Sequence, residues 1–202
     1  MFIRRESFNQ YIKMYPIVSL IIAVNIVMYI MTLIPGIGTE ILYAGASING
    51  LIAAGEWWRV LTSMFLHAGF MHILFNMFSL FLFGPELEKI AGKMRFLTIY
   101  FVAGIFGAAA TFATQDALYA SVGASGAIFG IIGAFGALVY YTRHTMPQLR
   151  QIIVPIIVIS VIMTFIQSNI NIPGHLGGLF AGFVLGLIYF KPKNMLRWRN
   201  KR

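Results

Sequence analysis

Three short fragments of the chain contain residues that could carry out acyl-transfer chemistry. They are HILFN with His72 and Asn76, GASG with Ser125, and GHLGG with His175. Each fragment lies near the start of a strongly apolar stretch, and polar residues in a lipid interior usually mark function. A serine and a histidine, together with further hydrogen-bond donors, are the groups needed to cleave an acyl bond. The sequence therefore predicts a serine hydrolase built inside a membrane.

The composition indicates an integral membrane protein. Hydrophobic residues make up 59% of the 202 residues and charged residues only 10%, and the mean hydropathy is +0.81. A soluble domain carries about 25% charged residues, so this chain cannot cover a water-facing surface. The absence of cysteine excludes disulfides and thiolate chemistry. We expect a single membrane domain over residues 1–202, with a short basic N-terminal segment (1–15) and a basic C-terminal tail (191–202).

Six apolar segments are predicted to cross the membrane: 16–34, 70–83, 94–112, 122–141, 152–166 and 175–190. A crossing helix needs about 20 residues, with about 17 as the lower limit. The second segment reaches that length only if its helix begins earlier, among residues 60–68, and the last two must be extended at their ends. The expected fold is therefore an all-α, six-transmembrane-helix bundle.

The segment between the first two spans, residues 35–69, is rich in glycine and contains Trp57 and Trp58. Glycine breaks helices, and tryptophan favours the membrane–water interface. We expect a first loop that is partly embedded in one leaflet. The alternative is a solvent-exposed loop with an aromatic anchor.

The basic residues predict the orientation of the bundle. With six spans, nearly all of them fall on one side of the membrane, and only Arg59 falls on the other. The positive-inside rule makes the basic side the cytoplasm, so we expect a multi-pass cell-membrane protein with both termini cytoplasmic. The net charge of +9 is then an orientation signal, compatible with contact to an anionic lipid bilayer, and we expect no nucleic-acid partner.

This topology places the candidate residues at a common depth. The second, fourth and sixth spans all run from outside to inside, and His72, Asn76, Ser125 and His175 lie early in them. The four side chains are therefore expected to lie together toward the outer face. Within that group, Ser125 is the candidate nucleophile and His175 the candidate base.

The chain lacks the residues that other hydrolase mechanisms need. None of the six carboxylates falls within a predicted span, whereas an intramembrane aspartic protease needs two buried ones. The HExxH motif of zinc proteases is absent. A zinc site formed by His67, His72 and His175 remains an alternative, although it would lack a carboxylate base. We expect no metal and no cofactor.

Without a carboxylate, a Ser–His dyad must orient its imidazole in another way. Phe129 lies four residues after Ser125 on the same helical face and could stack on His175; simple core packing of Phe129 is an equal alternative. Gly123 permits a tight entry that puts Ser125 near a helix N-terminus, where free backbone N–H groups attract negative charge. Taken alone, the GASG fragment is more typical of a serine helix cap beside glycine; the histidine at matching depth is what favours the catalytic interpretation.

His72 and Asn76 are spaced i, i+4 and project from one helical face. With the Ser125 amide they could form an oxyanion hole; an interhelical polar clasp is the alternative. His67 does not share this face and is interpreted as a loop or cavity-gating residue, and His144 as a solvated residue.

Stripes of small residues predict close helix contact between the fourth and sixth spans. The stripes are Gly126, Gly130 and Ala134 in the fourth span and Gly178, Gly182 and Gly186 in the sixth. Such stripes allow backbones to approach closely, which would bring Ser125 within hydrogen-bond reach of His175. The alternative role for the glycines is homodimerisation, and the oligomeric state is left open.

With these motifs in place, the chain resembles the rhomboid family of intramembrane serine proteases. The matching residues are Trp58 and Arg59, then His67, His72 and Asn76 in HAGFMHILFN, Glu88 and Gly92 in ELEKIAG, and the fragments GASG and GHLGG. The resemblance implies a six-helix core that cleaves single-span transmembrane proteins near the outer face without a cofactor. It also implies Ser125 as nucleophile, His175 as base, and His72 and Asn76 as oxyanion donors.

The resemblance further implies lateral substrate entry, gated by the fifth span and the loop 167–173. Gly174 stands where many members have alanine, and Phe129 where some have tyrosine. A rival hypothesis is a catalytically silent relative that escorts membrane proteins. Such relatives typically lack the serine or the histidine, and this chain has both. A transporter would be expected to show more intramembrane charge and inverted repeats.

Overall fold

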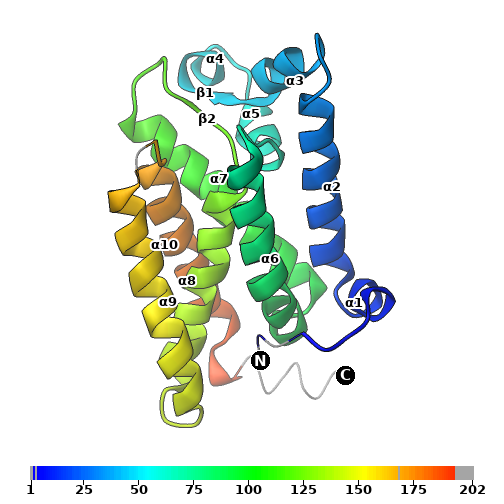
Figure 1. The fold of residues 1–202 in the computed structure, drawn as a ribbon. Coiled ribbons are helices and arrows are strands. Elements are labelled where there is room, and N and C mark those ends of the chain that lie inside the picture. Colours follow the sequence, from blue (N-terminus) through cyan, green and yellow to red (C-terminus); the bar gives the residue numbers. More distant parts are fainter. Residues whose placement is uncertain (1, 3, 168, 194–202) are drawn as a thin grey trace.

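The structure is a computed structural model that describes residues 2, 4–167 and 169–193. The long helices in this part of the chain are α2 (Pro16–Thr32), α6 (Phe70–Ala91), α7 (Lys93–Thr114), α8 (Ser125–Thr142), α9 (Pro147–Ile166) and α10 (Ile172–Tyr189). The shorter ones are α1 (Phe8–Met14), α3 (Gly38–Gly45), α4 (Asn49–Ala53), α5 (Arg59–Thr62) and the 3₁₀ helix η1 (Ser63–Phe65). Strands β1 (Ser47–Ile48) and β2 (Ala120–Ser121) pair antiparallel. Figure 1 shows the strands and α3–α5 gathered at one end of the long helices.

These helices confirm the expected all-α membrane bundle. Among the described residues, five helices are long and apolar enough to cross a membrane, and α1 with α2 makes a sixth, bent by 112°. α2 begins at the predicted residue, Pro16, because proline is favoured in the first turn of a helix. The fifth and sixth spans gain their missing length at their N-terminal ends, where α9 starts at Pro147 and α10 at Ile172.

The second span gains its missing length at its C-terminal end, and not at its N-terminal end as expected. α6 begins at Phe70 and not among residues 60–68, and it continues to Ala91 with Pro85 inside it. An interior proline removes one helix hydrogen bond and usually ends a helix. Membrane helices tolerate it when neighbouring helices compensate for the freed backbone group. The apolar pattern therefore ended this span too early, at Gly84 and Pro85.

The extension of α6 also overturns the prediction that no carboxylate lies in a spanning helix. Glu88 is 4% exposed, and its two oxygens accept hydrogen bonds from the backbone N–H groups of Ile17 (3.2 Å) and Val18 (2.9 Å). Those N–H groups are in the first turn of α2, where a helix offers them no partner. Glu86 pairs with Arg4 at 3.0 Å. Both carboxylates thus hold the N-terminal segment and take no part in the predicted site.

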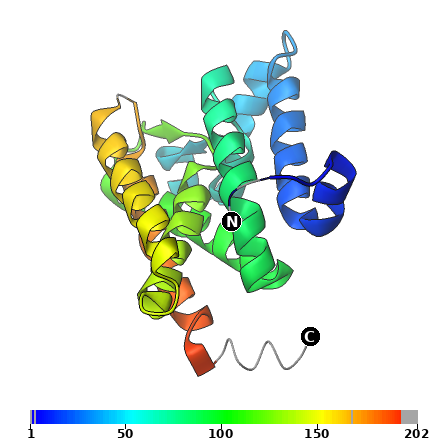
Figure 2. The ribbon, with the colours of Figure 1, turned by 60° about the horizontal axis from the view of Figure 1, so that its bottom comes forward.

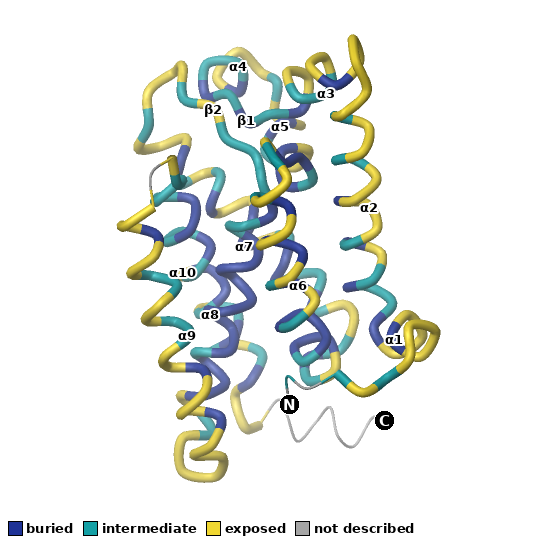
Figure 3. Tube along the Cα trace, viewed as in Figure 1, coloured by how far each residue is buried: buried dark blue, intermediate teal, exposed yellow. Residues whose placement is uncertain are grey.

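α8 lies at the centre of the bundle and α9 at its edge. Most residues of α8 are buried, whereas only 17% of the spanning part of α9 is buried inside the protein. Figure 3 shows this contrast as a dark α8 beside a largely yellow α9. Figures 1 and 2 place α2 and α9 at opposite edges, with the other long helices between them.

The small-residue stripes pack α10 directly against α8. A Cβ atom added to Gly178 would overlap the carbonyl oxygen of Gly126, and one added to Gly182 would overlap that of Gly130. Because these contacts are between backbones, no side chain could be moved aside to make room. The intramolecular role predicted for the stripes is confirmed.

The predicted first loop folds into α3, β1, α4, α5 and η1. Arg59, 3% exposed, donates hydrogen bonds to the carbonyl oxygens of Tyr43 and Ala46 and pairs with Glu56. These bonds tie the two ends of the segment together, because Arg59 is the first residue of α5 and Tyr43 belongs to α3. The insertion of this loop into one leaflet stays a prediction.

Candidate active site

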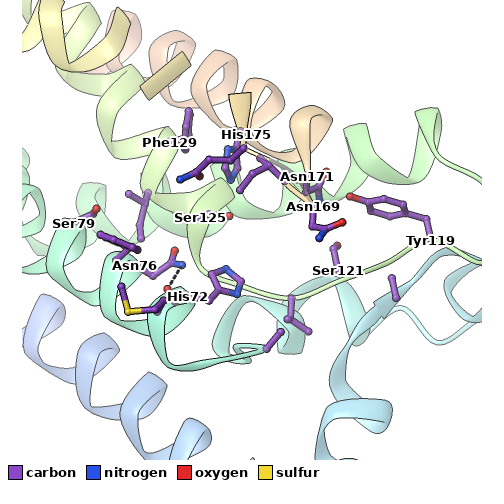
Figure 4. Close-up of a pocket in the computed structure, with 18 residues that line it drawn as sticks. His72, Asn76, Ser79, Tyr119, Ser121, Ser125, Phe129, Asn169, Asn171 and His175 are labelled. Atoms are coloured by element: carbon purple, nitrogen blue, oxygen red, sulfur yellow. Dashed lines mark hydrogen bonds between the residues drawn. The ribbon is translucent and has the colours of Figure 1, made fainter. Parts of the chain in front are cut away.

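The helices that carry the candidate residues begin at the same end of the bundle. Figure 1 shows the starts of α6, α8 and α10 at the end where the strands lie. A cavity of about 570 Å³ lies among them, and its lining includes His72, Asn76, Ser125, Phe129 and His175. Figure 4 shows these side chains arranged around that space. The structure therefore brings together residues as far apart in the sequence as His72 and His175.

Ser125 is the first residue of α8, and its position depends on Gly123. Gly123 has a φ of +127°, a backbone conformation that favours glycine. A Cβ atom there would lie 2.7 Å from Nε2 of His72 and 3.8 Å from Oγ of Ser125. The helix cap is Ala124, and no side chain caps this end, so the serine-cap interpretation of GASG was wrong. The Ser125 hydroxyl is not used to hold the helix.

His175 lies in the first turn of α10, 8% exposed. The Phe129 ring stacks on the His175 ring, with centroids 4.1 Å apart and an angle of 19° between the planes. Asn171 caps α10 by accepting a 2.9 Å hydrogen bond from the Gly174 amide. The Thr111 hydroxyl of α7 lies 2.9 Å from the same Asn171 oxygen and 3.0 Å from the carbonyl oxygen of Gly107, and it shares its one hydrogen between them. The stack predicted from the Ser125–Phe129 spacing is therefore present, and the start of α10 is anchored to α7.

The predicted hydrogen bond between Ser125 and His175 is not among those formed by the described residues, although both side chains line the cavity. Catalytic hydrogen bonds are often long in the free enzyme and shorten when substrate binds. On the histidine, Nδ1 lies 3.0 Å from Oγ1 of Thr164. The other ring nitrogen, Nε2, therefore remains available for a hydrogen bond with Ser125.

His72 and Asn76 both line the cavity from α6. The Asn76 side-chain amide donates a 2.8 Å hydrogen bond to the carbonyl oxygen of His72, four residues earlier. An amide nitrogen carries two hydrogens, so the second remains for a ligand. The pair can therefore present donors to the cavity while one Asn76 hydrogen fixes the side chain to its own helix.

Comparison with known proteins decides the family. A family model described as the Rhomboid domain matches residues 54–192, more than half of the chain. The chain belongs to the rhomboid family. It is 40% identical over 197 residues to the Bacillus subtilis protein named "Putative rhomboid protease YdcA", covering 96% of this chain and 98% of that protein.

Two further relatives show how the shared region sits in longer proteins. The chain is 43% identical over 180 residues to rhomboid protease GluP of Bacillus subtilis, which covers 86% of this chain but 35% of GluP. It is 31% identical over 190 residues to rhomboid protease AarA of Providencia stuartii, covering 80% of this chain and 66% of AarA. The chain is thus a multi-pass membrane protein and, by homology, an intramembrane serine protease, as the sequence predicted.

In this rhomboid, His67 is buried in the loop before α6 and contacts His72. It is 1% exposed, and its ring lies edge-on to that of His72 with centroids 5.0 Å apart. Neither ring nitrogen of His67 has a hydrogen-bond partner in the described part of the chain. The prediction of a loop residue is confirmed, and its gating role stays a prediction. No group of three metal-ligating side chains occurs among the described residues.

The burial of His67 predicts acid sensitivity. Burial, with a smaller effect from His72, lowers the pKa of His67 to about 3, against about 6.5 in the unfolded chain. Between these values the unfolded chain binds a proton that the folded protein does not. The free energy of unfolding should therefore fall as the pH drops below 6.5, by about 1.4 kcal/mol per pH unit. Thermal unfolding in detergent at pH 7.5 and 4.5 measures this, and His67→Phe should reduce the loss.

His144 offers the control for that measurement, because it lies exposed in the loop between α8 and α9. His144→Phe makes the same change of side chain at an exposed position, so it reports any effect of the substitution that does not depend on burial. If acid lowered the unfolding temperature equally in the protein with and without His67, the buried His67 could not be the cause of the acid sensitivity.

The sequence did not identify the roles of Asn171 and Thr164 in this rhomboid's site, nor the contact of His67 with His72. Asn171 carried a recognisable signal, because asparagine followed closely by proline is typical of a helix start. The contact of His67 with His72 had none, since it depends on how the loop before α6 folds. The contact of Thr164 with His175 also had none, because a lone threonine in an apolar helix is most often bonded only to its own backbone.

Proposed function

We propose that this rhomboid cleaves single-span transmembrane proteins near the outer face of the membrane, with Ser125 as nucleophile and His175 as general base. One observation carries the proposal. A serine whose hydroxyl caps nothing faces the same cavity as a buried histidine that is held by an aromatic ring. Each of these features is expected of an activated serine and is unusual for a structural one.

The proposed reaction uses the side chains of the cavity in sequence. The imidazole of His175 takes the proton from Oγ of Ser125 as that oxygen attacks the carbonyl carbon of the scissile peptide bond. Negative charge then develops on the carbonyl oxygen, which accepts hydrogen bonds from the Ser125 amide, His72 and Asn76. Each such donor is worth about 3 kcal/mol in the transition state. The imidazolium next gives its proton to the leaving amine, and water hydrolyses the acyl-enzyme with the same histidine as base.

The orientation of the bundle supports cleavage near the outer face. α1 and the C-terminal end of α10 lie at the end opposite the cavity (Figure 1). Among the described residues, the basic ones that precede α2, join α8 to α9 and follow α10 belong to that opposite end. By the positive-inside rule it faces the cytoplasm. We infer that both termini are cytoplasmic, that residues 1–202 form one membrane domain, and that α9 with residues 167–173 gates entry; Ser168 lies outside the described residues.

Two measurements on the reconstituted protein test the proposal. The rhomboid in liposomes should cut a model single-span protein on the side of the membrane that carries the cavity, which mass spectrometry of the fragments locates. A fluorophosphonate probe should label Ser125 in detergent, and His175→Ala should lose both the labelling and the cleavage. Labelling does not depend on the choice of substrate. A folded protein whose Ser125 stays unlabelled would contradict an activated serine and would fit the silent-escort hypothesis.

A further inference from the structure

One hydroxyl group on the outermost helix reaches His175. Thr164 lies in the last turn of α9 and is 2% exposed, one of the few buried residues of that helix. Its Oγ1 lies 3.0 Å from Nδ1 of His175 and 2.9 Å from the carbonyl oxygen of Ser160. Both contacts are within hydrogen-bond distance. The same oxygen atom therefore bonds its own helix and the candidate base.

Counting hydrogens decides the direction of each bond. A threonine hydroxyl has one hydrogen to donate, and a carbonyl oxygen has none. The contact with Ser160 can be a hydrogen bond only if the Thr164 hydroxyl donates to it. Oγ1 must then accept the second bond, so the hydrogen between Thr164 and His175 belongs to the histidine. Only this arrangement places a hydrogen in both contacts, and it puts the imidazole proton on Nδ1.

From this geometry we infer that Thr164 is a positioning residue, which holds His175 in the tautomer that carries hydrogen on Nδ1 and leaves the Nε2 lone pair free. The inference rests on the proposed function, because it matters only if His175 accepts a proton from Ser125. Of the two ring nitrogens, the one that is protonated is set by the hydrogen bond that the other makes. With the opposite tautomer, Nε2 would carry a hydrogen and could not accept the serine proton.

Thr164 and Phe129 restrict different motions of the same ring. Stacking on Phe129 holds the plane of the imidazole, but a stacked ring can still turn within its plane or flip. The hydrogen bond to Thr164 fixes which edge points away from the cavity. Together they supply the orientation that a carboxylate provides in a triad. Because Thr164 belongs to α9 while Ser125 and His175 belong to α8 and α10, this orientation depends on where α9 packs.

The hydrogen bond strengthens during the proposed reaction. When His175 accepts the serine proton it becomes an imidazolium, and hydrogen bonds from a charged donor are about twice as strong as neutral ones. The stabilisation is therefore larger in the transition state than in the free enzyme. Loss of the Thr164 hydroxyl should lower kcat and leave KM nearly unchanged.

Three variants separate this role from simple packing. Thr164→Val removes the hydroxyl and keeps the shape, and its kcat should fall about tenfold, which equals about 1.4 kcal/mol. Thr164→Ser restores the hydroxyl and should restore most of kcat. Thr98→Val is the matched control, because Thr98 donates to the carbonyl oxygen of Met94 in the same way on α7. It should leave kcat and KM unchanged.

The tautomer itself can be measured without activity. Nitrogen NMR of the ¹⁵N-histidine-labelled rhomboid, with His175→Ala used to assign the signals, should show hydrogen on Nδ1 of His175. Thr164→Val should lose that preference, and Thr164→Ser should keep it. If Thr164→Val does not fold, Thr164→Ala removes the same hydroxyl with less bulk and is measured in its place.

The outcomes of these experiments distinguish the role of Thr164 from the proposed function of the protein. A hydroxyl-free variant with unchanged kcat and an unchanged tautomer would overturn the role of Thr164. A variant with lowered kcat but an unchanged tautomer would also overturn it, because the loss would then come from packing. Failure of the unmodified rhomboid to cleave or to be labelled would contradict the proposed function alone, since the tautomer is read independently.

Discussion

Replacing Ser125 by alanine is expected to abolish cleavage of a reconstituted single-span substrate while leaving the fold intact. The proposed reaction would lose its nucleophile, and in serine hydrolases this costs more than about 10⁴-fold in kcat. The fold should persist because the Ser125 hydroxyl caps nothing and no hydrogen bond holds it among the described residues. Alanine is also well suited to the first turn of a helix. Initial cleavage rates and the thermal unfolding temperature, measured in the same detergent, check the two halves of this result.

Ser19→Ala provides the control for this measurement. Ser19 lies on α2 and donates to the carbonyl oxygen of Tyr15 at 2.8 Å, far along the chain from the cavity residues. It is also a serine of a spanning helix, so any general effect of the substitution would appear there as well. Ser19→Ala should cleave at the unmodified rate. Cleavage by Ser125→Ala at more than a trace of that rate would exclude Ser125 as the nucleophile.

Replacing Gly182 by alanine is expected to disrupt the packing of α10 on α8. The added Cβ would overlap the carbonyl oxygen of Gly130, and a helix backbone cannot move aside as a side chain can. The two helices must separate, which loses contacts along the whole stripe. Overpacking of a tight core costs about 1–3 kcal/mol and sometimes more. Because the same contact holds Ser125 near His175, we expect loss of activity together with a lower unfolding temperature.

Gly69→Ala is the matched control for that result. Gly69 precedes α6 with an extended φ of 178°, which any residue adopts, and an added Cβ would meet no atom within 4 Å. Its unfolding temperature should remain close to that of the unmodified rhomboid. If Gly182→Ala were as stable and active as Gly69→Ala, the close α8–α10 contact could not be the one that positions the site.

Local signals in the sequence were sufficient to locate the six spans and to place the starts of α2 and α8. α2 begins at the predicted Pro16, and α8 begins at Ser125 after the predicted turn at Gly123. These features depend on hydropathy and on the backbone preferences of proline and glycine, which act over a few residues. The small-residue stripes were also informative, because a helix face that carries only glycine and alanine can be recognised within a single segment.

Other local signals gave a wrong prediction, because they do not include the packing of the rest of the chain. Pro85 marks a helix end by its own chemistry, yet α6 continues through it, since the surroundings in a packed membrane bundle compensate. Glu88 looked like a loop residue for the same reason. Its true role, capping the first turn of α2, requires two segments about 70 residues apart to meet. The second span was therefore the one whose extension was predicted at the wrong end.

The sequence by itself thus determined the family, the membrane bundle and the five candidate side chains that line its cavity, His72, Asn76, Ser125, Phe129 and His175. Only the tertiary structure decided which hydrogen bonds and ring contacts each of these side chains makes. It showed the Ser125 hydroxyl uncommitted, Phe129 stacked on His175, His67 against His72, and Thr164 bonded to Nδ1 of His175. The physical reason is that a hydrogen bond or ring contact between segments far apart in the sequence forms only if their atoms are placed to within a few tenths of an ångström. Hydropathy and helix starts, by contrast, depend on residues that are neighbours in the sequence.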